Sequence, residues 1–380
     1  MKKYFVFSVI LLALVFDLSA SEVWAAATAE YQILATTMGG VQGMQVPMML
    51  LLDARGAPAP SGEQRASHAI PPGMKMGKEL PLLRPELQTG TAEKGVPGDL
   101  ENWTLKIYWG DSKEVGKGQP IVISPQDMKS GKGLAALAGS EGAWKGSPPA
   151  GWGWGQWPNK QSGIPVPAGA SLNGGHLVTG NYLPDIKFDI TRHDFLPPLN
   201  TKIGGDPSTS MGLSWKPVQG AVGYFAYAMA ADQAKRESII WTSSSKASMG
   251  VMTHEHSAQV KKLVGEGVVM SSNKTACNIP SGIFAGLDGV VVMMYAWGED
   301  YWMSYPPKPN NPPKDWKPDW TVNALFLSQW MGIPGMPDME ELTRMNSPAY
   351  DQDDAGETPA RDEPGEGRGG IGIPFPITGF

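Results

Sequence analysis

The chain has 380 residues, of which 41% are hydrophobic and 18% are charged, and its formal net charge is −6. The 47 glycines and 34 prolines show no Gly-x-y period and interrupt every heptad pattern, which excludes collagen, a coiled coil and a helical bundle. The low charged fraction argues against disorder of the whole chain, and the negative charge argues against a nucleic-acid-binding protein.

The first residues predict a cleavable signal peptide over residues 1–27. Lys2 and Lys3 form a positive start, Tyr4 to Phe16 is almost wholly apolar, and small residues follow at 25–27. An apolar stretch of this length spans about 20 Å as a helix, against about 30 Å for a hydrocarbon core, so cleavage is favoured over a membrane anchor. We therefore expect a mature chain without a transmembrane span, in the periplasm or at the cell surface or outside the cell.

Residues 28–204 are predicted to form an N-terminal β-sandwich-like domain with long Gly/Pro-rich loops. Apolar side chains alternate with polar ones over 104–109 and 186–190, as in strands with one buried face, whereas the apolar run 46–52 suits a strand covered on both faces. Residues 56–98 are rich in glycine, proline and charge, which predicts a long irregular excursion.

Tryptophans of this first domain form one candidate ligand-binding site: Trp144, Trp152, Trp154 and Trp157. The glycines between them would let several indoles face outward together, as a stacking surface for sugar rings. Alternatively, the indoles fold back over the edge of the sandwich, where each buried ring stabilises the fold by about 2–3 kcal/mol. We favour the structural interpretation and keep a carbohydrate-binding or carbohydrate-active protein as an alternative function.

The segment LSWKPVQGAVGYFAY (213–227) resembles strands B and C of a fibronectin type III module, in which an inward Trp of one sheet packs near an inward Tyr of the other. Residues 239–242, 275–283 and 290–299 fit its later strands. The resemblance covers about residues 208–303 and implies a fibronectin III-like domain at 205–305. The fold class is therefore expected to be mainly β, with two β-sandwich (immunoglobulin/fibronectin III-like) domains.

Three further segments resemble the sequences of an uncharacterised group of exported bacterial proteins: YWGDSKEVGKGQPIVIS, GNYLPDIKFDI and DWTVNALFLSQWMG. This resemblance implies export and β architecture. It implies no activity, and no functional residues are carried over from it.

His254 and His256, in the sequence THEH, form a second candidate site. On an extended strand both imidazoles point to the same side and could bind one zinc or copper ion, and methionine thioethers suit copper(I). The plainer interpretation is a polar lead into a helix predicted over 257–264, with methionine as core filler. We favour the plainer interpretation, expect no cofactor, and keep a periplasmic metal-handling protein as the second alternative.

Other chemistry has little support in the sequence. Cys277 is the only cysteine, so no intramolecular disulfide is possible, and its apolar surroundings predict a buried, inert thiol. Asp185 and Asp189 would lie about 13 Å apart along one strand, too far for a glycosidase pair. No GxSxG or P-loop motif occurs. The chain is therefore not expected to be an enzyme.

The last part of the chain divides in two. Residues 306–337 read as a Pro-rich linker followed by a strand at 322–327, which could return to either domain. Residues 338–380 are predicted to be an acidic, disordered tail, because ten acidic residues face three arginines between 338 and 368. This tail accounts for the net charge, and it is expected to aid solubility or to bind a basic partner.

Taken together, these patterns predict an exported, non-enzymatic binding or structural protein of the bacterial cell envelope. Its expected partner is an envelope protein or a polysaccharide, and the ligand stays open.

Overall fold

The computed structural model of the chain describes residues 27–41, 48–85, 102–130, 143, 146–249, 253–287 and 289–336. Residues 1–26 of the predicted signal peptide, Trp144 and the predicted acidic tail lie outside the described residues. Strands are the main regular secondary structure of the described part, which confirms the mainly-β class. Within these ranges, no helix is both long and apolar enough to cross a bilayer.

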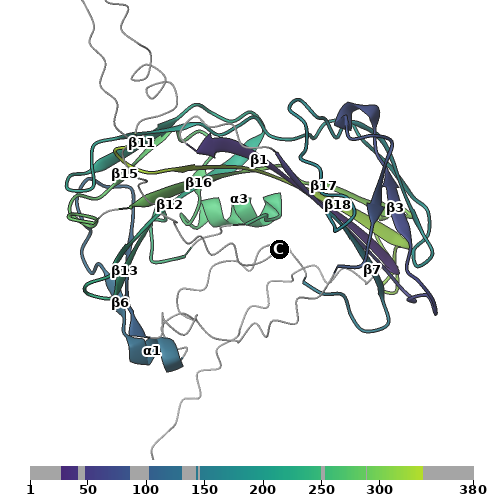
Figure 1. Cartoon of the computed structure of the whole chain (residues 1–380), viewed down its shortest axis with the longest axis horizontal. Helices are drawn as coiled ribbons and strands as arrows, with labels where there is room; N and C mark the ends of the chain where they lie inside the picture. Colours follow the sequence, from purple (N-terminus) through teal and green to yellow (C-terminus); the bar gives the residue numbers. More distant parts are fainter. Residues whose placement is uncertain are drawn as a thin grey trace, which may run out of the picture.

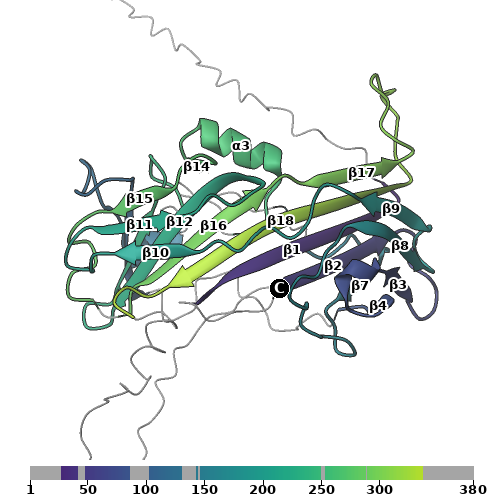
Figure 2. The ribbon, with the colours of Figure 1, turned by 90° about the horizontal axis from the view of Figure 1, so that it is seen from above.

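One long sheet runs through the molecule in the order β6-β5-β13-β12-β16-β18-β1-β2-β7 (Figures 1 and 2). Two shorter strands are added to it, β14 beside β12 and β17 beside β18. The bounds are β1 (Ala29–Val41), β2 (Met49–Gly56), β5 (Thr104–Trp109), β6 (Ile121–Ile123), β7 (Gly153–Trp157), β12 (Ala221–Asp232), β13 (Glu237–Thr242), β14 (Met270–Ser271), β16 (Val291–Gly298), β17 (Tyr301–Tyr305) and β18 (Trp320–Gly332).

Two small sheets cover one face of the long sheet, near its opposite ends (Figure 1). The first has the order β4-β3-β8-β9, with β3 (Ala66–Ala69), β4 (Glu79–Leu82), β8 (Gly174–Gly180) and β9 (Ile186–Ile190). The second has the order β10-β11-β15, with β10 (Thr201–Gly204), β11 (Met211–Trp215) and β15 (Ala276–Ile279). Buried side chains of both small sheets belong to one continuous apolar core, which includes Ile186 and Leu213 together with Tyr31 and Ala226 of the long sheet.

The opposite, concave face of the long sheet carries α3 (Ser257–Gly265) (Figure 1). Val260 and Leu263 of this helix pack against Phe225 and Trp297, which point away from the small sheets because side chains alternate along a strand. The helix predicted over 257–264 is thus confirmed. Two shorter helical turns are α1 (Pro125–Ser130) and η1 (Pro72–Met74).

The two predicted domains share this long sheet. β1 pairs in parallel with β18, and β5 pairs in parallel with β13, so strands from before the predicted boundary flank a central block of strands from after it in one sheet. The boundary itself, between residues 204 and 205, falls inside the antiparallel hairpin of β10 and β11. Two separate sandwich domains are therefore not confirmed. The strand predicted at 322–327 is part of β18, which joins β16 on one side and β1 on the other.

The link between the two small sheets crosses the long sheet at Gly39. The backbone N–H of Leu199 donates to Ser328 Oγ at 2.9 Å, and a Cβ atom at Gly39 would lie 1.6 Å from the Leu199 carbonyl oxygen. We expect Gly39→Ala to lower the free energy of unfolding by about 1–3 kcal/mol, because the crossing segment must move away from the strand.

Urea denaturation measures this effect, and Gly212→Ala is the matched control. Gly212 also lies in a strand, β11, but a Cβ atom there meets nothing within 4 Å. Equal stability losses in the two variants would mean that the close crossing at Gly39 is not what restricts this position.

Candidate functional site

A cavity of about 520 Å³ lies on the α3-bearing face of the long sheet, at the end formed by β1, β2 and β7. Strand alternation creates its floor, because Met49 and Leu51 of β2 point to this face while Leu52 and Ala54 enter the core. Its other apolar walls come from β1, from β7 and from the segment after β7, with Leu34, Trp157, Ile164, Pro165 and Val166.

Only a few polar side chains line this cavity: Thr36, Gln156 and His254. His254 Nε2 lies 3.0 Å from Thr36 Oγ1, so two of the three are bonded to each other. Burial lowers the pKa of His254 to about 4, although a backbone hydrogen bond at Ala35 acts in the opposite direction. The imidazole is therefore neutral at physiological pH, and the cavity contains no cation from this residue.

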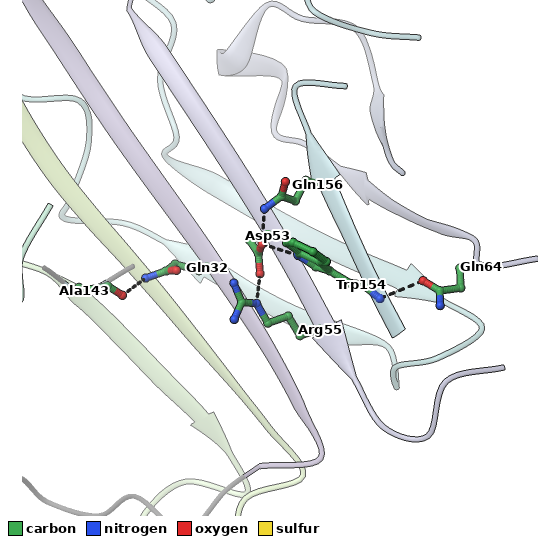
Figure 3. A network of polar contacts seen from close by, with 7 residues as sticks. All are labelled: Gln32, Asp53, Arg55, Gln64, Ala143, Trp154 and Gln156. Carbon is green, nitrogen blue, oxygen red and sulfur yellow. Dashed lines mark hydrogen bonds and ion pairs between the residues drawn. The ribbon is translucent and has the colours of Figure 1, made fainter. Parts of the chain in front are cut away.

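A buried polar network borders the cavity along β2 and β7 (Figure 3). Asp53 is 1% exposed and Arg55 is 4% exposed, and the Arg55 Nε–H donates to Asp53 Oδ1. The other carboxylate oxygen, Asp53 Oδ2, accepts from Trp154 Nε1 and from Gln156 Nε2, both at 2.7 Å. The Arg55 guanidinium also lies 5.8 Å from the centre of the Trp154 ring.

This network determines the shape of the cavity wall. A carboxylate buried without donors would be very costly, and three donors from two neighbouring strands satisfy Asp53. Gln156 is shared, since its side chain both lines the cavity and donates to Asp53. The hydrogen bonds from Trp154 and Gln156 to Asp53 therefore link β7 to β2, and they hold one polar wall of the cavity in place.

The predicted tryptophan surface is not assembled by the described residues. Trp157 is 2% exposed and its Nε1–H donates to Ser162 Oγ at 2.9 Å, so this indole is a core residue. Trp154 is half-buried on the opposite face of β7, where Asp53 holds it, and Trp152 is half-buried before the strand begins. The glycine-spaced segment forms a strand, and its alternation separates indoles that an irregular loop could have gathered.

The two histidines of the predicted metal site have different partners. His254 faces Thr36 in the cavity, whereas His256 Nδ1 lies 3.1 Å from Asp300 Oδ2, after β16. Asp300 is partly buried, which raises its pKa, but hydrogen bonds from His256 and Ser257 outweigh this and lower it to about 2. Among the described residues, no group of three or more His, Cys, Asp or Glu side chains could hold a metal ion.

Cys277 is buried in β15 and is not in a disulfide, as the sequence predicts. Burial raises the pKa of its thiol, with Asp111 acting in the same direction, so the thiol stays protonated and unreactive.

A second, more polar cleft of about 510 Å³ lies between the ends of β5, β13 and β14. Its charged groups neutralise each other, because Lys274 Nζ lies 2.8 Å from Asp111 Oδ2 and Asp111 also accepts from Asn278. The charged side chains Lys274 and Asp111 of this cleft are therefore paired with each other. We take the apolar cavity as the candidate ligand site.

Comparison with known proteins adds no family to this description. No model of a protein family matches the chain, and a search of curated proteins finds no significant match.

Proposed function

We propose that this chain is an exported, non-enzymatic binding protein of the bacterial cell envelope, and that the apolar cavity holds an apolar group of its ligand or partner. The cavity carries the proposal. Its volume of about 520 Å³ falls within the range of about 300–1,000 Å³ that is typical of ligand pockets. Two of its lining side chains, Met49 and Ile164, are 37% and 49% exposed, so the cavity presents apolar surface that a ligand could cover.

We also infer that the region from β10 to β18 is a fibronectin III-like sandwich. The strand pairing supports this inference, because β11 pairs with β15 in one sheet while β12 pairs with β13 and β16 in the other. The Trp215 and Tyr224 rings lie 5.4 Å apart across the two sheets, and Tyr224 Oη accepts from the Val218 N–H at 2.8 Å. In this view, β1, β2 and β7 lengthen the second sheet and create the cavity beside the sandwich.

A fluorescence titration tests the cavity. N-phenyl-1-naphthylamine, a neutral dye that brightens in apolar surroundings, should bind the purified protein and saturate. The double variant Met49→Glu/Ile164→Glu should bind it at least tenfold more weakly, because ligand binding would have to bury carboxylates.

The matched control is Val122→Glu. Val122 is 53% exposed in β6 and does not line the cavity, so its variant should bind the dye like the unmodified protein. Dye binding that is absent from the unmodified protein, or equal in all three proteins, would contradict the proposed function.

A further inference from the structure

Three polar side chains are buried between the four-stranded sheet and the long sheet. Tyr31 of β1 is 1% exposed, His68 of β3 is fully buried, and His176 of β8 is 2% exposed. The Tyr31 hydroxyl lies 2.7 Å from His68 Nδ1, and His68 Nε2 lies 2.9 Å from His176 Nδ1. This series of hydrogen bonds ends at a backbone carbonyl, where His176 Nε2 lies 2.7 Å from the Leu172 oxygen.

The Leu172 carbonyl oxygen determines the position of every hydrogen in this series of hydrogen bonds. A carbonyl oxygen only accepts, so His176 Nε2 carries a hydrogen and, in the neutral ring, Nδ1 is an acceptor. His68 Nε2 must then donate to His176, which leaves His68 Nδ1 to accept from the Tyr31 hydroxyl. With both histidines neutral, three donors meet three acceptors.

The surroundings favour the neutral rings. Phe188 of β9 stacks on His176, with ring centroids 4.7 Å apart and planes inclined by 5°, and Tyr301 lies beyond it. Burial and the neighbouring ring of His176 hold the pKa of His68 well below its usual range. Burial also lowers the pKa of His176 and outweighs the Leu172 hydrogen bond and the charge of exposed Asp189 on β9.

The groups around Tyr31 act in the same sense. Burial holds the pKa of Tyr31 well above its usual range, and Asp53 and Tyr182 raise it further, so the hydroxyl remains a donor. The only other histidine near this region, His193, contacts Tyr301 and Phe326 through its ring.

We propose that the chain Tyr31–His68–His176 is an acid-sensitive latch, which holds the four-stranded sheet on β1 at neutral pH and releases it when a histidine takes up a proton. An additional proton gives these three side chains four hydrogens to donate, against three acceptors. Even if the Tyr31 oxygen turns to accept, one hydrogen and one charge remain buried without a partner among these three side chains. Opening of the interface lets water solvate both.

The sign of the pH dependence follows from linkage. The folded pKa of each histidine is lower than the unfolded value of about 6.5, so the open form binds more protons below that pH. The latch is therefore fully stabilising above about pH 6.5, and its closed population falls as the pH decreases. Each proton taken up on opening shifts the open-to-closed ratio about tenfold per pH unit.

Hydrogen exchange of the full chain between pH 7 and pH 5, corrected for intrinsic rates, tests the proposal. Below about pH 6.5, amides of β3 and β8 should lose protection by up to about tenfold per pH unit for one proton and up to about a hundredfold for two, whereas little change is expected between pH 7 and about pH 6.5. The sheet β10-β11-β15 contains no histidine and serves as the internal reference. Equal behaviour of the two sheets would overturn the latch.

Variants separate the latch from the other histidines. His68→Gln/His176→Gln retains a donor and an acceptor at each position but cannot titrate, so the pH dependence of β3 and β8 should disappear. His193→Gln and His254→Gln should leave it in place. Nitrogen-15 NMR of the unmodified protein provides a second reading, because both rings should be Nε2–H tautomers at pH 7. A ring in the Nδ1–H form, or one that titrates near pH 6.5, would contradict the proposal.

Discussion

Asp53→Ala is expected to lower the free energy of unfolding by about 3–5 kcal/mol, the usual cost of removing one partner from a buried ion pair. The substitution leaves the 4%-exposed Arg55 without the carboxylate that its Nε–H contacts. Trp154 Nε1 and Gln156 Nε2 also lose their common acceptor. Urea denaturation followed by circular dichroism measures the change.

Two controls separate burial from charge. Glu63→Ala removes an ion pair with Arg65 in which both side chains are more than 70% exposed, so the urea midpoint should be nearly unchanged. Asp53→Leu/Arg55→Met removes both buried charges, and it should be more stable than Asp53→Ala because no buried guanidinium remains without the Asp53 carboxylate. A double variant that is less stable than the single one would show that loss of the pair itself, and not the loss of one carboxylate from a buried arginine, determines the change in stability.

Local elements of the fold could be predicted because their causes are local. Residues 186–190 and 211–215 alternate strictly between apolar and polar side chains or glycine, and both are strands with buried alternate positions. The helix at 257–265 follows from Val260 and Leu263 on one face of a short segment. Neither inference requires knowledge of what lies across the sheet.

The arrangement of these strands could not be predicted in the same way. β1 and β18 pair in parallel although about 290 residues separate Ala29 from its partner Trp320, and no turn fixes their register. Parallel neighbours are chosen by the fit of whole buried faces, which a single sequence does not display. The predicted division into domains therefore did not anticipate that β1 and β5 join strands from the second half of the chain.

The candidate site shows the same limit. Its cavity collects residues from β1, β2, β7, the segment after β7 and the segment before α3. Trp157 and His254 were both candidate site residues, but they belonged to two different predicted sites, and no pattern in the sequence places them in one cavity. One signal was present: Asp53 and Arg55 continue the alternation of Met49 and Leu51, so two charges share a face with apolar side chains. His68 and His176 gave no such signal, because 108 residues separate the two rings that touch.

The tryptophan-rich segment provides the second large effect. Trp157→Ala is expected to lower the free energy of unfolding by about 3–5 kcal/mol, because a 2%-exposed indole in the core is replaced by empty volume. The variant also removes the donor to Ser162 Oγ. Thermal unfolding and urea denaturation measure the loss, and Trp302→Ala, at a 37%-exposed indole of β17, should cost much less.

The same variant distinguishes the two interpretations of these indoles. If Trp157 is structural, its loss reduces stability and enlarges the cavity that it lines, and a panel of oligosaccharides should not change the tryptophan fluorescence of the unmodified protein. If the indoles form a sugar-binding surface, saccharides should shift that fluorescence and Trp157→Ala should abolish the shift with little change in stability. The burial of Trp157 against the core favours the first outcome, since an indole held there must leave the core before it can stack on a sugar ring.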